Sequence, residues 1–208
     1  MRVDKRLATR FFDEKEILSV EKFYEFINRI KIIVFVPDEH TEKVMLEMFR
    51  AGAGKIGNYE MCSFSTGGTG TYRPNENARP FAGKKNLLSR ASEIKFEVEC
   101  DPEYLNEALE VLFKHHPYEE IAYEIHSFKK RGNETGVIVN LKKGIKMSQL
   151  VKRLNKKIAD PAFDSDMNIM KIALTNNTKE EHILESAKLT SCEYLIIISN
   201  NNHKLFKI

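Results

Sequence analysis

Cysteine is scarce in this chain, and its spacing argues against a disulfide-stapled fold. Three cysteines occur, Cys62, Cys100 and Cys192, and no two of them form a CxxC pair or another short pattern. An odd and sparse set of this kind is typical of reduced thiols in a cytoplasmic protein. We therefore expect a cytoplasmic location and no disulfide framework.

The chain also lacks long apolar runs and a strong excess of charge of one sign. No stretch approaches the roughly eighteen apolar residues that a membrane span requires, and charge begins at Arg2 without the apolar segment of a secretory leader. Lysine plus arginine number 33 against 30 acidic residues, which gives a formal net charge of +3. Nucleic-acid binding typically neutralises about six to ten phosphates, so this balance does not indicate it. We expect no membrane partner.

The apolar content is sufficient for folded domains. With 208 residues, 42% of them hydrophobic, the chain can form one large or two small domains with proper cores. Residues 1–29 are predicted to be a helical segment, in which Ser19 caps a short helix with Phe23, Phe26 and Ile27 on one side. We place the first domain at 30–130 and a second unit at 131–208.

The pattern over 30–130 predicts an α+β domain of the ferredoxin-like type. A β-branched run at 30–36 predicts a strand buried on both faces, and strict alternation over 93–100 predicts a strand with one wet face. The expected order is strand 30–36, a helix between Asp38 and a left-handed cap at Gly52, strand 56–66, loop 67–92, strand 93–100, a helix opened by Asp101-Pro102 and ended by Pro117, and strand 121–125. This βαββαβ order places both helices on one face of the sheet.

The remaining residues, 131–208, predict a small α/β unit with a parallel sheet. The expected elements are a turn at Gly132-Asn133, strand 136–141, a helix capped by Ser148 and reaching Ile158, strand 169–174, a capping box at Thr178–Glu181 and strand 194–198. Alternation of strands and helices is typical of such units.

Several short motifs follow one another in residues 33–128. They are Val34-Phe35-Val36-Pro37, Ala51–Tyr59, Cys62-Ser63-Phe64-Ser65, Gly68–Pro74, Pro80-Phe81 and His116-Pro117-Tyr118-Glu119-Glu120. In this order and spacing they resemble the inserted domain of the YqfO (Nif-three-like) family, and the last run also resembles the CutA proteins, which share a fold with PII signalling proteins. The resemblance implies a PII/CutA-like domain. Because strand-edge pairing makes trimers in those folds, it also implies a homo-oligomer, a trimer or a multiple of one.

The resemblance weakens over 136–198 and implies that the family's metal site is missing. Family members carry a Gly-rich segment where Thr175–Thr178 stand here, and they bind two divalent metals with residues that have no counterpart in 1–29 or after strand 194–198. We therefore predict no metal ligands, no cofactor and no catalytic residues. The leading hypothesis is a non-catalytic, regulatory protein that binds a small molecule or a protein partner. The alternative is a divalent-metal-dependent hydrolase of the family, similar to GTP cyclohydrolase type 2.

The Gly-rich stretch 67–71 is the center of the candidate ligand site. Its backbone N–H groups could bind an anion, although glycines that merely give the loop conformational freedom are the reading we favour. By resemblance to PII proteins, a mobile interaction loop would lie here. The candidate ligand-binding residues are Asn58, Tyr59, Cys62, Ser63, Ser65, Gly68, Thr69, Gly70, His116, Tyr118 and Glu119.

Two further patterns have competing readings. His116 follows a helix, where imidazoles interact favourably with the helix dipole, and we favour a structural role over a metal role shared with Glu119 or Cys62. Residues 142–157 hold seven basic and no acidic residues, and their anion-binding candidates are Lys152, Arg153, Lys156 and Lys157. A solvated face is the reading that we favour over a nucleic-acid partner, because no aromatic residues for base stacking are interleaved.

Overall fold

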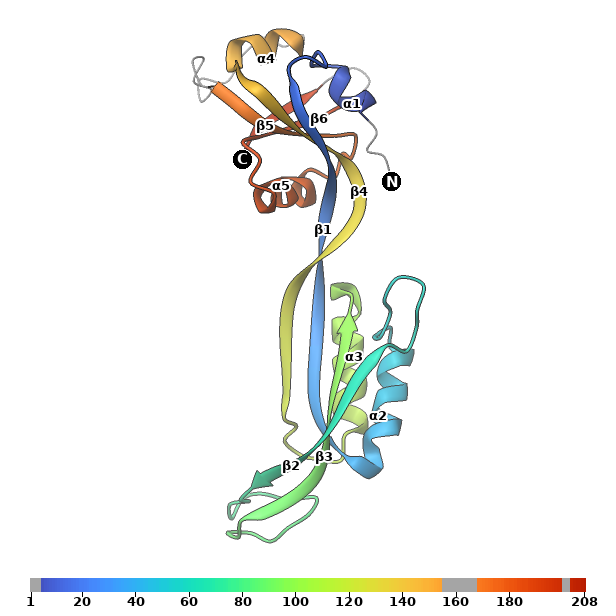
Figure 1. Cartoon of the computed structure of the whole chain (residues 1–208). Coiled ribbons are helices and arrows are strands. Elements are labelled where there is room, and N and C mark those ends of the chain that lie inside the picture. Colours follow the sequence, from blue (N-terminus) through green and yellow to red (C-terminus); the bar gives the residue numbers. More distant parts are fainter. Residues whose placement is uncertain (1–4, 155–167, 200–202) are drawn as a thin grey trace. The chain divides into compact units, whose positions relative to one another are not determined.

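The computed structural model describes residues 5–154, 168–199 and 203–208, and the chain divides into two compact units. The middle unit is Asn28–Lys129, and the terminal unit combines the residues up to Ile27 with Lys130–Ile208. Strands β1 (Ile17–Pro37) and β4 (Tyr123–Lys146) each contribute residues to both units (Figure 1).

The middle unit is a mixed α+β structure with two helices on one face of its sheet. The strand order is β2-β3-β1-β4, and β3 (Ser89–Cys100) runs antiparallel to both β1 and β2 (Ser63–Tyr72). Helices α2 (Asp38–Arg50) and α3 (Leu105–His115) lie side by side (Figure 1), and the 3-10 turn η1 (Pro102–Tyr104) precedes α3.

Period-two alternation in the strands builds the core of the middle unit. The register places Ile32 opposite Val98 and Val34 opposite Phe96, and all four face the helices with at most 1% of their surface exposed. Met48 of α2 and Leu112 of α3 are fully buried against them. The predicted strand at 30–36, the alternation over 93–100 and the two helices are confirmed.

The terminal unit has the strand order β1-β4-β5-β6-β7 and helices on both faces. Its further elements are α1 (Arg6–Thr9), α4 (Met147–Arg153), β5 (Asn168–Thr175), α5 (Glu180–Leu189), β6 (Tyr194–Ile197) and β7 (Lys204–Lys207). Alternate residues of β5 and β6 enter two separate cores, one under α1 and α4 and one under α5. None of the helices in the described ranges is long and apolar enough to cross a membrane.

The predicted parallel sheet of this unit is correct only in part. β5 and β6 are parallel, but β4 pairs antiparallel with β5, and β6 pairs antiparallel with β7, a strand that the sequence did not reveal. The sheet is therefore mixed, because β4 continues from the middle unit and does not arrive by a helical crossover.

The prediction of a helical segment over residues 1–29 is wrong for most of its length, including the short helix that Ser19 was expected to cap. Residues 17–29 belong to β1, and within the described residues that precede this strand the helix α1 ends at Thr9. Phe23 and Ile27 have helical spacing, but the stretch is rich in aromatic and β-branched residues that favour strands. Long-range partners decide the conformation: Thr135 Oγ1 donates to the Phe23 carbonyl at 3.4 Å, and the Phe26 N–H donates to Ser186 Oγ at 2.8 Å.

The loop predicted at 67–92 is also wrong at both ends. β2 pairs with β3 from Ser63 to Tyr72, so Gly67–Thr71 is strand, and the connecting loop is limited to 73–88. The strand predicted at 56–66 accordingly begins later, at Ser63, and residues 56–59 form an isolated bridge between Ile56 and Tyr59. Glycine composition favours a loop locally, but the ladder with β3 overrides it.

Three predicted turn and cap positions differ from the structure as well. Gly132-Asn133 lies inside β4 and makes no turn. α4 begins at Met147 with Lys146 as its N-cap, so Ser148 is inside the helix, and Ile158 lies outside the described residues. α5 begins after Lys179 without a side-chain cap, and the capping box at Thr178 does not form. Gly52, in contrast, adopts φ +96° at the end of α2, as predicted.

We predict that Phe96→Ala lowers the free energy of unfolding by about 3–5 kcal/mol, because it leaves a cavity where a fully buried ring packs against Phe49. Phe113→Ala is the control, since that ring is 51% exposed on α3, and should cost about 1 kcal/mol or less. Urea unfolding followed by circular dichroism measures both values. Equal costs would contradict the core described above.

Candidate functional site

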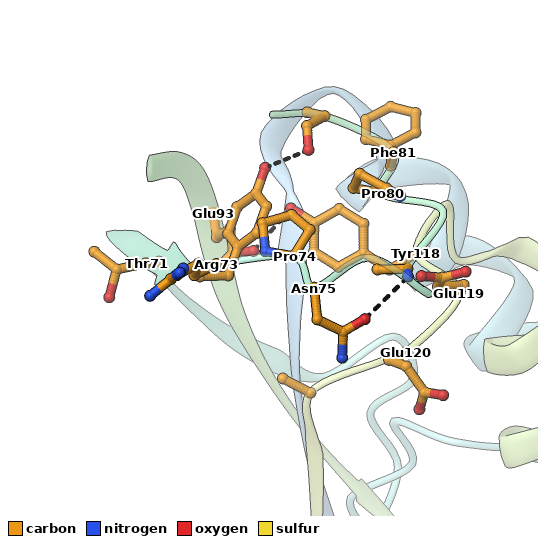
Figure 2. A pocket seen from close by; sticks show the side chains of 15 residues that line it. Thr71, Arg73, Pro74, Asn75, Pro80, Phe81, Glu93, Tyr118, Glu119 and Glu120 are labelled. Atoms are coloured by element: carbon orange, nitrogen blue, oxygen red, sulfur yellow. Dashed lines mark hydrogen bonds between the residues drawn. The ribbon is translucent and has the colours of Figure 1, made fainter. Parts of the chain in front are cut away.

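A pocket of about 390 Å³ lies in the middle unit, where the loop 73–88 meets the segment that follows α3 (Figure 2). Its walls come from the end of β2, from that loop, from β3 and from residues 118–122. The lining residues are Gly70, Thr71, Tyr72, Arg73, Pro74, Asn75, Ala78, Pro80, Phe81, Ala82, Glu93, Tyr118, Glu119, Glu120 and Ala122. A volume of this size suits a small organic ligand.

Short-range hydrogen bonds give the loop a defined shape. Asn75 Oδ1 accepts from the N–H groups of Asn77 at 2.9 Å and Ala78 at 3.1 Å, which is an Asx turn. Tyr72 Oη donates to the Ala82 carbonyl at 3.0 Å, and the Arg79 N–H donates to Glu119 Oε1 at 2.6 Å. These bonds tie the loop to β2 on one side and to the segment after α3 on the other.

Tyr118 and Glu93 form the polar center of the pocket. Tyr118 Oη donates to Glu93 Oε1 at 2.9 Å, and in Figure 2 the Tyr118 ring lies between Glu93 and Glu119. A Cβ on Gly70 would collide with the Glu93 carboxylate in its present position, so a larger residue at this position of β2 would require that carboxylate to shift. Burial and the neighbouring carboxylate raise the pKa of Tyr118, which keeps the phenol protonated.

His116 holds the backbone of Tyr118 in place through a hydrogen bond. Its Nε2 lies 3.0 Å from the Phe35 carbonyl oxygen, which can only accept, so Nε2 carries the proton. Nδ1 then accepts from the Tyr118 N–H at 3.1 Å. Because both nitrogens are engaged and the residue is only 7% exposed, the ring fits a structural role, and no lone pair is left for a metal. Burial lowers the pKa of His116 and favours this neutral form.

The structure brings together only part of the predicted site. Among the candidates, Gly70, Tyr118 and Glu119 line the pocket, and His116 lies behind Tyr118. The other candidates do not line it: Asn58, Tyr59, Cys62, Ser63, Ser65, Gly68 and Thr69. Cys62 Sγ lies 3.8 Å from the Glu60 carbonyl oxygen, and Ser63 Oγ, at the start of β2, lies 3.9 Å from Met45 Sδ of α2.

Sequence reasoning missed the remaining lining residues, Glu93 and Phe81 above all. Glu93 was assigned to the wet face of an alternating strand, and that face carries the pocket. Phe81 and Pro80 were part of the motifs behind the resemblance but were assigned to a loop without a role. The signal that could have revealed Phe81 was an aromatic residue within a segment otherwise composed of residues typical of loops.

The basic stretch 142–157 is partly neutralised. Both terminal nitrogens of Arg153 donate to the Glu16 carboxylate at 2.8 Å and 2.7 Å, and Nη1 also donates to the Phe11 carbonyl at 3.1 Å. The Arg153 pair holds the pKa of Glu16 below its ordinary value. Lys152 lies on α4, while Lys156 and Lys157 lie outside the described residues. Arg153 therefore has a structural role within the terminal unit.

Further candidates for a site are the buried Cys100 thiol and the metal-binding side chains of the described residues. All three cysteines are free, and burial raises the pKa of the Cys100 thiol to about 11, which makes it a poor nucleophile. Within the part of the chain that the structure describes, no three His, Cys, Asp or Glu side chains are grouped closely enough to hold a metal ion.

Three curated relatives of this chain carry the name GTP cyclohydrolase 1 type 2 homolog. The protein of Halalkalibacterium halodurans is 38% identical over 64% of this chain and 35% of its own length. The Listeria innocua protein is 33% identical over 80% and 46%, and the Listeria monocytogenes protein is 31% identical over 86% and 50%. The chain thus spans half or less of the length of these relatives. No family model matches it.

Solved structures with similar chains include a Bacillus cereus protein related to NIF3. It aligns with 91% of this chain and 50% of its own, at a TM-score of 0.45 and 26% identity. The periplasmic divalent cation tolerance protein CutA from Archaeoglobus fulgidus aligns with 51% of this chain and 88% of its own, at a TM-score of 0.37 and 14% identity.

We predict that stability falls as the pH drops below about 6.5, where a histidine in the unfolded chain takes up a proton. In the folded protein the pKa of His116 is lower than in the unfolded chain. The unfolded state therefore binds more protons in this pH window, and the contribution of His116 to the free energy of unfolding is fully present only above it. His116→Gln should flatten the decline, whereas His126→Gln, at an exposed position, should not. Urea unfolding between about pH 5 and 8 measures the slope; identical slopes in all three proteins would contradict the role of His116.

Proposed function

The chain belongs to the YqfO/Nif-three-like family of GTP cyclohydrolase 1 type 2 homologs, and from that premise we propose that it is a non-catalytic binding protein whose ligand site is the pocket around Tyr118 and Glu93. We propose that it acts in the cytoplasm. Its partner is a small molecule or a protein that presents a small group to the pocket.

The Tyr118–Glu93 hydrogen bond is the observation that carries this proposal. A phenol whose pKa is raised by burial and by an adjacent carboxylate holds its proton, so the pair fixes a ligand and does not transfer protons at neutral pH. The loop 73–88 and the segment after α3 are joined by the Arg79–Glu119 bond, which shapes the walls before a ligand arrives.

We infer that the middle unit has the ferredoxin-like βαββαβ layout of CutA and PII proteins. The strand order β2-β3-β1-β4, the antiparallel pairing of β3 with both neighbours and the position of α2 and α3 on one face support it. In this layout the loop between β2 and β3 projects from one end of the sheet.

We also propose that the protein forms a homo-oligomer, a trimer or a multiple of one, through the edge strand β2. This strand is at the end of the sheet order and contains neither charge nor proline over ten residues, SFSTGGTGTY. Phe64 on it is 67% exposed. Natural edge strands usually carry lysine, proline or a bulge that blocks pairing, so an edge without them favours pairing with another copy.

The ligand proposal predicts that protein purified without denaturation retains a small molecule in native mass spectrometry. Phe81→Ala should lose it, because this ring lies 6.0 Å from the Tyr118 ring in the pocket wall. The matched control is Phe113→Ala, since Phe113 is 51% exposed against 48% for Phe81 and packs on Tyr123 outside the pocket.

If both variants retain the small molecule equally, it binds elsewhere, and the proposal that this pocket is the ligand site is wrong. The same preparation is to be analysed for metals and for GTP turnover. Stoichiometric divalent metal together with hydrolysis of GTP would instead support the alternative function, a metal-dependent hydrolase.

For self-association, we predict that Phe64→Lys shifts the protein to the mass of a monomer, because it places a charge on the unprotected edge. Phe113→Lys changes an equally large ring to lysine on α3 and should leave the mass unchanged. Size-exclusion chromatography with light scattering decides. A native chain that stays monomeric across micromolar concentrations would refute the proposed oligomer.

A further inference from the structure

Carboxylates outnumber basic groups along the wall of the pocket. Glu93, Glu119 and Glu120 are among its lining residues, and Arg73 is the single basic one. Glu93 accepts from a phenol and Glu119 from a backbone N–H. Across the described ranges, no lysine, arginine or histidine forms an ion pair with any of the three.

Other carboxylates on the same strand are neutralised. Glu97 of β3 lies 2.7 Å from Lys95 Nζ and 3.3 Å from Lys31 Nζ, and these lysines lower its pKa. Glu99 lies 3.8 Å from Arg29 Nε. Along this face of β3, Glu93 is therefore the carboxylate that points to a cavity and pairs with a neutral group.

Aromatic and proline side chains make up much of the remaining wall. Tyr72, Phe81 and Tyr118 line the pocket together with Pro74 and Pro80. Figure 2 shows Phe81, Tyr118 and the two prolines. A cation over an aromatic face is attracted by the ring electrons, and the rings also shield the apolar part of a ligand.

A second hollow beside the pocket is also lined by aromatic and acidic side chains. It shares Phe81, Ala82 and Tyr118 with the pocket and adds Asp38 and Glu39 of α2 against Arg90 of β3. The region around Phe81 and Tyr118 therefore attracts positive charge. The loop's other basic residues, Arg79, Lys84 and Lys85, are not among the lining side chains, and Lys85 Nζ donates to the Glu76 carbonyl at 2.6 Å.

The geometry points to a small organic cation as the ligand, an amine or guanidine carried on an apolar or aromatic group, with Glu93 as its counter-charge and Tyr118 and Phe81 as its aromatic wall. This inference depends on the proposed function of the pocket. A bare divalent ion fits the site less well, because it requires several grouped oxygen ligands, and the described residues contain no such group.

The test uses the whole chain and three probes that share a phenyl ring: phenethylamine, phenethyl alcohol and phenylacetate. Isothermal titration calorimetry should give phenethylamine a dissociation constant on the order of tenfold lower than the alcohol, since a charge-assisted hydrogen bond exceeds a neutral one by that amount. Phenylacetate should bind weakest.

Glu93→Gln should remove the preference for the amine. Gly70→Ala keeps every charge but displaces the Glu93 carboxylate, and should weaken amine binding several-fold.

Glu110→Gln removes an exposed carboxylate on α3 and should change nothing, so it controls for net charge. Equal binding of the alcohol, a preference for phenylacetate or an amine affinity insensitive to Glu93→Gln would overturn the organic cation but leave the pocket as a ligand site. Amine binding displaced by Mn²⁺ would overturn it in favour of a metal. Failure of all three probes to bind would count against the pocket itself.

Discussion

The imidazole of His116 is the contact on which the pocket depends. One nitrogen donates to the Phe35 carbonyl of β1 and the other accepts from the Tyr118 N–H, so a single rigid ring joins the sheet to the segment after α3. Only a neutral histidine can donate at one end of the ring and accept at the other. Burial favours this form, and the fixed backbone of Tyr118 then directs its phenol to Glu93. The polar center of the site is thus set by a residue that does not line it.

One face of strand β3 packs into the core, and the other face contributes Glu93 to the pocket. Phe96, Val98 and Cys100 are buried under the helices, and the alternate residues carry charge. Because the strand period is two, the core residues fix the direction in which Glu93 points. The neighbouring strand contributes Gly70, whose missing side chain provides the space that the carboxylate occupies. The glycines of β2 therefore have at least one role that is specific to their place in the sheet.

The sequence predicted the elements whose burial pattern is local, and it failed where a distant partner decides. The run 30–36 and the alternation over 93–100 contain their own period, and both strands were predicted. The strand at residues 19–29 was not predicted, because the spacing of its apolar residues fits a helix and its partner in β4 lies more than a hundred residues away in the sequence. Glycine composition at 67–71 favours a loop, and only the ladder with β3 shows that it is strand.

The candidate site was predictable to the extent that its residues lie within short sequence motifs. Gly70, Tyr118 and Glu119 were named because short motifs contain them, but the same motifs also suggested Asn58 and Cys62, which do not line the pocket. Glu93 comes from a third segment, and its alternation with apolar residues gives the same pattern as any wet strand face. Periodicity shows which side of a strand is wet but not which residue on that side has a pocket above it.

A partly buried carboxylate without a cation costs stability, because the lost hydration is only partly replaced. Elsewhere the middle unit avoids this cost: Arg29 pairs with Glu99 and Asp101, and Glu97 pairs with two lysines. Glu93 departs from that rule in the place where aromatic rings and a shaped loop leave an open volume. Natural sequences break their local rules mainly at functional sites, and a ligand that carries the missing positive charge would satisfy the carboxylate and account for the departure.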